Sequence, residues 1–371
     1  MPPRSFVFVI SKLDPGGAQL LQLQLAREMR SRGHRASTWF LYLERSAYED
    51  EPDVRVLLAR PARSPLAYAV ILWRLVALMR AERPDAVCCA LPLANLLGAL
   101  AGWLAGVGTR VATHHYPIDT ISGLKRLTDR LWARAGIFTH VVAVSRAVAQ
   151  SFARQGPHYR RRMSVIANGV ALPPRRLDRQ AARRRFGLPD DAFVLGTAGR
   201  LAEQKNQWVL LEAMKSVPGL HVAMAGAGPL EAELRARAAP LGDRIHWLGA
   251  LPPEEIPDFL GALDLFVLPS LFEGMPLAVI EALHARLPIV ASDIPTISEV
   301  VAPDDAPAGA VLVPHDDPAA WADAIRAVAA DPGRRAALVA AGETIAGRFT
   351  FDAMADAYEH LLAGARRSDP A

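Results

Sequence analysis

Two glutamates eight positions apart have the chemistry to hold a polyhydroxylated ligand. Glu273 and Glu281 begin and end the segment Glu-Gly-Met-Pro-Leu-Ala-Val-Ile-Glu, which follows a predicted strand over 265–268. A carboxylate in a loop accepts hydrogen bonds from hydroxyl groups, and a second carboxylate on the following helix can bind a diol. We predict these roles for Glu273 and Glu281, with an ordinary exposed helix residue as the alternative for Glu281.

Gly274 and Pro276 shape the loop between the two glutamates. Glycine tolerates backbone angles that other residues avoid, and proline is favoured in the first turn of a helix. The sequence therefore predicts an unusual backbone angle at Gly274 and a helix over 276–285, with Glu273 left in the loop before it.

Two cations lie between another predicted strand and its helix. Arg200 and Lys205 follow a strand over 193–198 and precede a helix over 206–216. Lysine is scarce in this chain, which has four in all. A diphosphate placed here gains two positive charges and the free N–H groups of the helix N-terminus. A pair of solvated cations is the alternative.

The first half of the chain has two further candidates at strand ends. His114 and His115 end a predicted strand over 109–113, where a histidine can hydrogen-bond a hydroxyl or transfer a proton. Gly16 and Gly17 follow the first strand and open the first helix, where a ligand can approach the backbone and an anion is favoured. A structural histidine and a plain tight turn are the alternatives.

Several catalytic motifs are missing from the sequence. It has no Asp-x-Asp pair, no Gly-x-x-x-x-Gly-Lys-Ser/Thr loop and no Gly-x-Ser-x-Gly elbow, and the glycines after the first strand do not form Gly-x-Gly-x-x-Gly. Phosphate-loop, α/β-hydrolase and nicotinamide chemistry therefore lose support, and no metal site is predicted. The two cysteines, Cys88 and Cys89, are adjacent and predict neither a disulfide framework nor a zinc site.

The two halves of the chain carry opposite charge. Residues 1–170 contain 23 Lys and Arg against 11 Asp and Glu, and residues 171–371 contain 19 against 27, which together give the net charge of +4. The basic half predicts an anionic partner, such as nucleic acid, a membrane surface or a phosphorylated substrate. No zinc-finger, homeodomain or aromatic ribonucleoprotein signature accompanies this charge, which disfavours nucleic acid.

Strand-like runs alternate with helical patterns along the 371 residues, which predicts βαβ units and parallel sheets. One helix is expected over 146–155. A linker is expected over 171–191, with a short basic helix around 178–186 inside it. We predict two doubly wound α/β domains, 1–171 and 172–348, with ligands outside the carboxyl ends of the strands. We expect a C-terminal helix in 349–371, and one alternative is that it crosses back to the first domain.

The stretch 86–109 has no charged residue, and about 20 apolar residues are enough to cross a membrane. Pro92, Asn95 and several glycines interrupt it. We therefore interpret it as a buried strand over 86–91 followed by a small-residue helix over 93–105.

The motifs taken together form an ordered set. They are Gly16-Gly17-Ala18-Gln19, Val165-Ile166-Ala167-Asn168-Gly169-Val170, Gly199-Arg200 with Lys205-Asn206, Gly226-Ala227-Gly228-Pro229-Leu230, Leu268-Pro269-Ser270, Glu273 with Glu281, Pro288-Ile289-Val290-Ala291-Ser292-Asp293, and Glu299. Over nearly the whole chain, this set resembles the retaining GT-B-fold glycosyltransferases of family 4, also called glycosyltransferase group 1. The resemblance implies two Rossmann-like domains facing across a cleft, the first for an acceptor and the second for a nucleoside-diphosphate sugar.

The resemblance also implies roles for single residues of the second domain. Arg200 and Lys205 are expected to bind the diphosphate and to stabilise the charge on the leaving nucleotide. Glu281 is expected to hold the ribose hydroxyls, and the nucleobase to lie near Leu248 and Leu251. The donor sugar is expected at Glu273 and at the backbone of Gly274, Met275, Pro276 and Leu277.

In the first domain, the resemblance places His115 near the reaction centre and Gly17 against the diphosphate. It implies that no metal and no other cofactor is needed. Many family members have glycine where Pro276 stands, and proline has no N–H, so one donor contact is expected to differ. No nucleophile is evident, and we hypothesise that the acceptor attacks from the side of the leaving group.

Rival functions keep the same nucleotide-sugar site. A GT-B-fold epimerase and a nucleotide-sugar-binding protein without activity are the alternatives, and a phosphorylase is disfavoured because no lysine has a pyridoxal-phosphate context. The sequence leaves open the donor sugar, uridine or guanosine as its base, and the acceptor. A lipid-linked or polysaccharide-precursor glycan is the expected acceptor class.

Anionic lipid is a candidate partner for the basic half. The segments 66–80, with Trp73 and Arg74, and 125–134, with Trp132, mix basic and apolar residues. Such a surface can lie on an anionic membrane, and a solvated helix face is the alternative. We expect a cytoplasmic protein, with a peripheral contact on the inner face of the cell membrane as one of the alternatives.

Overall fold

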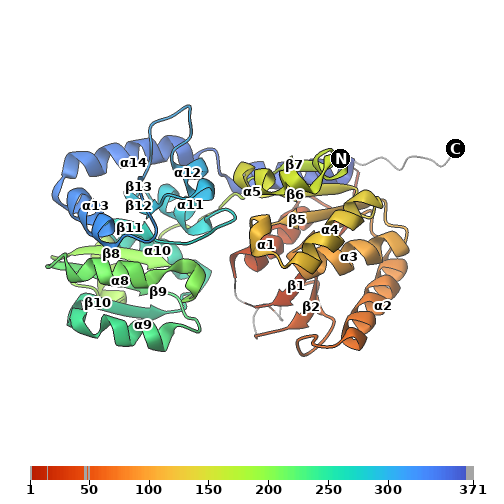
Figure 1. Ribbon diagram of the computed structural model, residues 1–371, viewed down its shortest axis with the longest axis horizontal. Helices are drawn as coiled ribbons and strands as arrows, with labels where there is room; N and C mark the ends of the chain where they lie inside the picture. Colours follow the sequence, from red (N-terminus) through yellow and green to blue (C-terminus); the bar gives the residue numbers. More distant parts are fainter. Residues whose placement is uncertain (1, 15, 46–47, 49–50, 365–371) are drawn as a thin grey trace. The chain divides into compact units, whose positions relative to one another are not determined.

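The computed structural model describes residues 2–14, 16–45, 48 and 51–364. The chain divides into two compact units: unit 1 contains Met1–Asn168 and Asp352–Ala371, and unit 2 contains Gly169–Phe351. Each unit is built on its own parallel sheet with helices packed against it, which confirms the predicted pair of doubly wound α/β folds (Figure 1).

The sheet of unit 1 has the strand order β3-β2-β1-β4-β5-β6-β7, and all its neighbouring strands are parallel. The chain builds this sheet outward from β1 to one side and then from β4 to the other. The strands are β1 (Ser5–Leu13), β2 (Arg35–Leu43), β3 (Val54–Val56), β4 (Ala86–Ala90), β5 (Thr109–His114), β6 (His140–Ala143) and β7 (Met163–Val165).

The helices of unit 1 begin where local sequence signals place them. Ser64, for example, accepts a hydrogen bond from the N–H of Ala67 at 3.2 Å and is followed by Pro65, the first residue of α2. The helices are α1 (Gly17–Ser31), α2 (Pro65–Glu82), α3 (Pro92–Leu104), η1 (Ile118–Thr120), α4 (Gly123–Arg134), α5 (Arg146–Ser151), η2 (Phe152–Gln155), α6 (Pro157–Arg160) and α15 (Phe351–Gly364).

The uncharged stretch 86–109 is a strand and a helix, as predicted. All five residues of β4 are buried between its neighbours β1 and β5, and α3 packs on the same strands. A central parallel strand is covered on both faces, which explains the continuous apolar run. No helix in the described part of the chain is long and apolar enough to cross a membrane.

The single helix predicted over 146–155 is wrong in its second half. The α-helical conformation ends at Ser151, and η2 follows as a 3₁₀ turn. Gly156 then has a φ of 99°, and Pro157 starts the short helix α6, which the sequence analysis did not predict. Glycine with a positive φ ends one helix, and the proline after it is favoured in the first turn of the next.

The helix α15, which ends the described part of the chain, is joined to the rest of unit 1 by an ion-pair network. Arg32, next to the end of α1, pairs with Asp356 at 2.6 Å and with Glu359 at 2.7 Å. Nε2 of His34 lies 3.1 Å from Glu359, and Nδ1 of His34 accepts the N–H of Arg4 at 3.1 Å. Residues 352–364 thus belong to unit 1, and residues 365–371 lie outside the described part.

Unit 2 has a six-stranded sheet in the order β10-β9-β8-β11-β12-β13, again with parallel neighbours. The strands are β8 (Phe193–Ala198), β9 (Leu220–Ala225), β10 (Ile245–Gly249), β11 (Leu265–Leu268), β12 (Ile289–Ser292) and β13 (Val311–Val313). The helices are α7 (Arg179–Arg185), η3 (Glu203–Lys205), α8 (Gln207–Lys215), α9 (Glu231–Ala238), η4 (Ala239–Arg244), η5 (Pro253–Glu255), α10 (Ile256–Ala262), α11 (Leu277–His284), α12 (Pro295–Val301), α13 (Pro318–Ala330) and α14 (Pro332–Ala346).

The basic helix predicted in the linker is α7, and it is attached more firmly than a linker helix needs to be. Arg183 is buried, donates to Asp264 at 2.7 Å, and donates to the carbonyl oxygens of Pro189 and Ala192 at 2.9 Å. A buried guanidinium needs such partners for its fork of N–H groups. The segment is therefore part of unit 2.

The segments at the two ends of unit 2, 169–170 and 349–350, lie side by side. Val170 donates its N–H to the carbonyl oxygen of Phe349 at 3.0 Å and forms a parallel bridge with Thr350. A Cβ atom on Gly169 would lie 2.0 Å from the carbonyl oxygen of Thr350. Only glycine allows this close approach of two backbones.

Candidate active site

The strand order of unit 2 places its candidate site between β8 and β11. The chain extends the sheet from β8 toward β10 on one side and from β11 toward β13 on the other. In such sheets, ligands bind at the carboxyl ends of the two strands where the order reverses. The loop after β8 contains Arg200 and Lys205, and the loop after β11 contains Glu273.

Lys205 and Glu273 meet at this point. Nζ of Lys205 lies 2.5 Å from Oε1 of Glu273, and the hydroxyl of Ser270 donates to the same oxygen at 2.7 Å. The side chain of Glu273 is 6% exposed and that of Lys205 is 18% exposed. The side-chain amide of Gln204 donates to the other oxygen, Oε2, at 3.5 Å. Donors on both oxygens fix the orientation of this buried carboxylate. The structure thus brings together two residues that the sequence analysis assigned to different parts of the ligand.

The loops around this pair are joined to one another by backbone hydrogen bonds. Gly199 donates its N–H to Ala225 at 2.9 Å, and Gly226 donates to Gly249 at 2.6 Å. A Cβ atom on Gly226 would lie 1.9 Å from the carbonyl oxygen of Gly199. The ends of β8, β9 and β10 therefore form one continuous support for the site, and the Gly-Ala-Gly motif is explained by packing alone.

The loop between the two glutamates differs from its prediction in two details. Among the glycines of these loops, Gly199, Gly226 and Gly249 have positive φ values and Gly274 does not. Pro276 precedes the first helical residue, Leu277, with a ψ of 88°, and its carbonyl oxygen accepts the N–H groups that open α11. Pro276 therefore caps the helix and does not form part of its first turn.

The side chain of Glu281 is less exposed than that of an ordinary surface residue. Part of its side chain is exposed, yet desolvation of the carboxyl group raises its pKa to about 7, and the positive charge of Lys205 lowers the pKa only in part. Burial disfavours the charged form of a carboxyl group. The alternative interpretation of Glu281 as an ordinary exposed helix residue is therefore wrong. The protonation of its carboxyl group changes near neutral pH.

Arg200 behaves differently from Lys205. Its side chain is exposed and makes no ion pair among the described residues, while its carbonyl oxygen accepts from the side chain of Gln207 at 3.0 Å. The guanidinium of Arg200 is therefore available to an anion.

Leu248 and Leu251 line a cavity of about 360 Å³ beside the end of β10. Phe186 and Trp247 also line it, and the guanidinium of Arg235 lies 4.8 Å from the centre of the Trp247 ring. Arg185 and Glu255, which pair at 2.9 Å, also line the cavity. A flat heteroaromatic ring with polar edges would meet both apolar and charged groups there. Phe186 was not predicted for this site, because it lies far from Leu248 along the chain and only the fold brings the two residues to one cavity.

In unit 1, the two histidines at the end of β5 have different surroundings. Nε2 of His114 pairs with the hydroxyl of Tyr159, and this hydroxyl donates to Oδ2 of Asp129 at 2.6 Å. Burial lowers the pKa of His114 to about 3 and raises that of Asp129 to about 7. His114 is thus a structural residue of a buried network.

His115 is 8% exposed, and its Nε2 has no hydrogen-bond partner. Burial, with a smaller contribution from His114, lowers the pKa of His115 to about 4. The imidazole is therefore neutral at pH 7 and carries a buried nitrogen that can accept or donate one further hydrogen bond.

Gly16 and Gly17 lie where the first helix of unit 1 begins. Gly16 has an extended backbone with a φ of −170° and accepts the N–H of Leu20 at 3.0 Å, and Gly17 is the first residue of α1. A Cβ atom on Gly16 would lie 2.7 Å from Oε1 of Gln19. The Gln19 side chain can move away from such a Cβ atom, and an extended backbone is open to any residue, so the local structure does not by itself require glycine at position 16.

Residues that the sequence analysis did not assign also hold the site of unit 2. The side chain of Gln204 donates to the carbonyl oxygen of Phe272 at 3.0 Å, and the N–H of Leu271 donates to Gln204 at 2.8 Å. Asn206 adopts the left-handed conformation, with a φ of 52°, and donates to the carbonyl oxygen of His315 at 2.7 Å. The run of polar residues around Lys205 was the available signal, but only the fold shows which loops it joins.

Comparisons with known proteins agree with this architecture. The family model described as "Glycosyl transferases group 1" matches residues 178–344, and that described as "Glycosyltransferase Family 4" matches residues 15–172. HepE of Anabaena, solved in complex with UDP and glucose, is 21% identical, covers 97% of this chain and 99% of its own, and has a TM-score of 0.84.

Two curated relatives match parts of the chain. The capsular polysaccharide biosynthesis glycosyltransferase CapM of Staphylococcus aureus is 24% identical over 172 residues, which are 44% of this chain and 45% of the relative. The D-inositol 3-phosphate glycosyltransferase of Stackebrandtia nassauensis is 32% identical over 148 residues, which are 35% of this chain and 32% of the relative. Each match spans less than half of the relative's length.

The fold and the loops at its strand ends thus define a protein with two Rossmann-like units of the GT-B type. The two family matches cover one unit each, and the chain belongs to the group 1 glycosyltransferases.

Proposed function

We propose that this protein is a retaining glycosyltransferase that moves a sugar from a nucleoside-diphosphate sugar, linked to UDP or GDP, to a hydroxyl group of an acceptor. The observation that carries this proposal is the pairing of Lys205 with Glu273 at the point where the strand order of unit 2 reverses. The names of the relatives, a capsular polysaccharide enzyme among them, support a lipid-linked or polysaccharide-precursor glycan as the acceptor.

The proposed donor site lies in unit 2. Arg200 and Lys205 bind the diphosphate, and their charge stabilises the nucleotide as it leaves. Glu281 accepts hydrogen bonds from the ribose hydroxyls, and the cavity at Leu248 and Leu251 takes the base. Glu273 and the backbone of residues 274–277 hold the donor sugar. No metal and no other cofactor takes part, so transfer is expected to continue in EDTA.

The proposed contributions of unit 1 are smaller in number. His115 contacts the donor sugar through its unpartnered Nε2, and the N-terminus of α1 at Gly16 and Gly17 favours the diphosphate. The acceptor is bound by unit 1, whose positive charge suits an anionic substrate.

We further propose that the acceptor oxygen attacks the anomeric carbon from the side of the departing phosphate. The bond between this carbon and the phosphate oxygen breaks as the new glycosidic bond forms, and the proton of the acceptor hydroxyl passes to the departing phosphate oxygen. The configuration is kept without a protein nucleophile. Mass spectrometry of the protein incubated with donor alone tests this step, because a covalent sugar–enzyme adduct contradicts it.

The donor site is tested by thermal unfolding with UDP, GDP, ADP and their common sugar conjugates. A ligand at 100 times its dissociation constant stabilises the protein by about 2.7 kcal/mol. One nucleotide is expected to stabilise the wild type but not Lys205→Ala or Arg200→Ala. Lys215→Ala is the matched control, because Lys215 is an exposed lysine of the same unit that pairs with Glu212. Equal stabilisation of all four proteins contradicts the proposal.

The alternatives are separated by what the protein consumes. An epimerase converts a nucleotide sugar without a second substrate, and a binding protein leaves it unchanged. We expect release of the nucleotide to require an acceptor extract and to stop in Glu273→Ala. Conversion of the sugar with donor alone supports an epimerase instead.

We also propose that one face of unit 1 contacts an anionic membrane. Of the large apolar side chains that are exposed in the described part of the chain, most belong to three helices that pack in series, α2, α3 and α4. They are Leu66, Tyr68, Trp73, Trp103, Leu104, Leu124, Leu127 and Leu131. Such a concentration of exposed apolar residues next to basic ones is typical of a membrane-contacting surface.

The structure changes which residues of this face are candidates. Trp132 turns to the protein and donates its indole N–H to the carbonyl oxygen of Leu96 at 3.0 Å, and Arg74 bonds to the carbonyl oxygen of Leu57. Leu124 and Leu131 are 77% and 49% exposed and take their place.

Binding to lipid vesicles tests the membrane contact. We expect the wild type to bind anionic vesicles at low salt and to lose this binding when Leu124→Ser and Leu131→Ser are combined. Val165→Ser, which changes an exposed apolar residue elsewhere in unit 1, is the control. Equal binding to neutral vesicles, or no binding at low salt, contradicts the proposal.

A further inference from the structure

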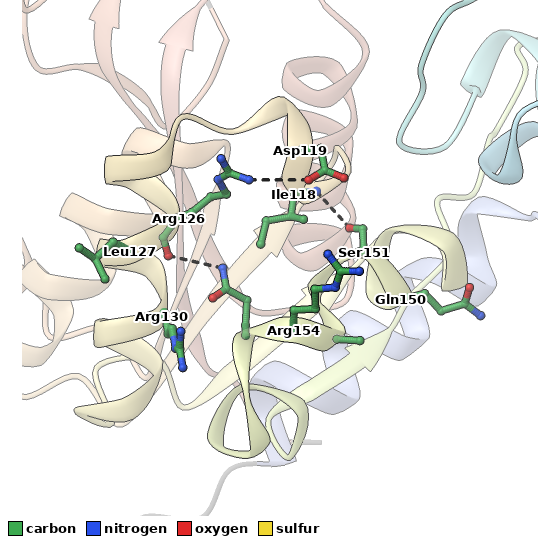
Figure 2. Close-up of a pocket in the computed structure, with 10 residues that line it drawn as sticks. Ile118, Asp119, Arg126, Leu127, Arg130, Gln150, Ser151 and Arg154 are labelled. Atoms are coloured by element: carbon green, nitrogen blue, oxygen red, sulfur yellow. Dashed lines mark hydrogen bonds and ion pairs between the residues drawn. The ribbon is translucent and has the colours of Figure 1, made fainter.

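A second cavity, of about 610 Å³, lies in unit 1 (Figure 2). Its walls are η1 and α4 on one side and α5 and η2 on the other. Arg126, Arg130 and Arg154 line it together with Asp119 and the large apolar residues Ile118 and Leu127. Its volume is that of an ordinary small-molecule site, which holds about 300–1,000 Å³.

The charge of this lining is strongly positive. Three arginines face one aspartate, and this aspartate pairs with Arg126 at 3.6 Å through a side chain that is 87% exposed (Figure 2). Arg130 and Arg154 make no ion pair with any residue in the described part of the chain. Cations gathered in a concave wall raise the local potential and attract anions.

The walls of the cavity are held in place by hydrogen bonds. The N–H of Ile118 donates to the hydroxyl of Ser151 at 3.0 Å, and this hydroxyl donates to the carbonyl oxygen of Val148 at 2.6 Å. The buried side chain of Gln155 donates to the carbonyl oxygen of Arg126 at 3.4 Å. These bonds join η1 to α5 and α4 to η2, so that the cationic wall is formed before any ligand arrives.

The same part of unit 1 also contains the candidate histidine. Ile118 follows His115 by three residues, and Asp129, between Arg126 and Arg130 on α4, is bonded to the Tyr159–His114 pair. The cavity is thus attached through its backbone and through a buried network to the end of β5.

We propose that this cavity binds a phosphate ester carried by the acceptor. That the ligand is the acceptor rests on the proposed function. That it carries a phosphate rests on the cavity alone. Guanidinium groups bind phosphate oxygens through paired N–H donors, and two of them here have no carboxylate to compete with the ligand. Ile118 and Leu127 cover the apolar part of a molecule whose anionic end lies at the arginines. The phosphate belongs either to a lipid-linked acceptor or to a water-soluble sugar phosphate.

The test measures binding of two probes to the full chain by titration calorimetry. Decyl phosphate represents the lipid-linked source, glycerol phosphate represents the soluble one, and decyl glucoside is the uncharged comparison. The variant combines Arg130→Gln and Arg154→Gln, which keep a polar side chain at each position and remove the charged guanidinium group. Arg134→Gln is the matched control, because Arg134 is exposed one turn further along α4 and does not line the cavity.

We expect the double variant to bind at least one phosphate probe about tenfold more weakly than the wild type, as the loss of charge-assisted hydrogen bonds implies. Arg134→Gln is expected to bind as the wild type does. Tighter binding of decyl phosphate than of glycerol phosphate identifies the lipid-linked source, and equal binding identifies the soluble one. No phosphate binding by the wild type, or unchanged binding by the double variant, overturns the proposal.

These results are independent of the donor site. The double variant is expected to keep the nucleotide-induced stabilisation of the wild type, whereas Lys205→Ala loses it and keeps phosphate binding. Failure of the nucleotide test with intact phosphate binding therefore contradicts only the proposed function.

Discussion

Nζ of Lys205 lies 2.5 Å from Oε1 of Glu273, although 68 positions separate the two residues in the chain. One follows β8 and the other follows β11, the neighbouring strands at which the order of the sheet reverses. The pair therefore fixes the two loops of the candidate donor site against each other before any ligand binds.

Removing one member of this pair is expected to cost stability. Lys205→Ala leaves the buried Glu273 carboxylate with Ser270 as its remaining close donor, and an unpaired buried charge costs about 1–3 kcal/mol or more. Glu273→Gln is expected to cost less, because a neutral amide can still accept from Ser270. Urea unfolding of both single variants and of the double variant measures the coupling; additive effects contradict a direct interaction.

Glu281 predicts a pH dependence of donor binding. Its pKa is raised to about 7, so the carboxyl group is mostly protonated at pH 6 and mostly ionised at pH 8. The ionised form accepts two hydroxyl donors, and affinity for UDP-glucose is expected to rise by up to about tenfold across this range. UDP-glucose is the right probe because its diphosphate does not titrate there. Glu281→Gln removes the dependence, and an unchanged slope in this variant contradicts the assignment.

Asp129 predicts an opposite kind of pH dependence, in stability. Its pKa in the folded protein is about 7, above the ordinary value of 3.8, so the folded state holds the proton more tightly. The stability gained in this way is present below pH 4 and is lost as pH rises through 7, at about 1.4 kcal/mol for each unit of pKa difference.

Other buried groups act against this effect, so a variant has to isolate it. His114 and His115 have lowered pKa values of about 3 and about 4, and their contribution grows as pH rises toward 6.5. The difference between wild type and Asp129→Asn removes the titration of groups outside the network of His114, Tyr159 and Asp129 from the comparison. We expect the variant to gain stability relative to wild type between pH 4 and 8. A constant difference across this range would show that Asp129 does not titrate there.

The contact of α15 with unit 1 is expected to depend on Arg32. Its guanidinium pairs with Asp356 and Glu359, and networks of this kind contribute more than isolated surface pairs. Arg32→Ala is expected to cost about 1–2 kcal/mol and to speed amide hydrogen exchange in α15. Arg27→Ala is the control, since Arg27 lies on α1 and pairs with Glu51 instead of with α15. Equal exchange in both variants contradicts an anchoring role for Arg32.

The helices and strands followed closely from local sequence signals. Apolar runs such as 86–90, and helix starts such as Ser64-Pro65 and Asp317-Pro318, depend on neighbouring residues and on burial, which any sequence displays. The break inside 146–155 was not predicted because the α-helix ends at Ser151, a full turn before the sequence signals Gly156 and Pro157.

Residue types and their order were enough to propose the donor site, since Arg200, Lys205, Glu273 and Glu281 follow strand ends in the required sequence. Three properties depended on contacts between distant segments. Lys205 pairs with Glu273 because β8 and β11 are neighbours, Trp132 turns inward because α3 offers it a carbonyl oxygen, and three arginines share a cavity because η2 packs beside α4. A one-dimensional pattern specifies which groups are present, whereas their pairing, burial and pKa values arise only when the fold sets distances and removes water.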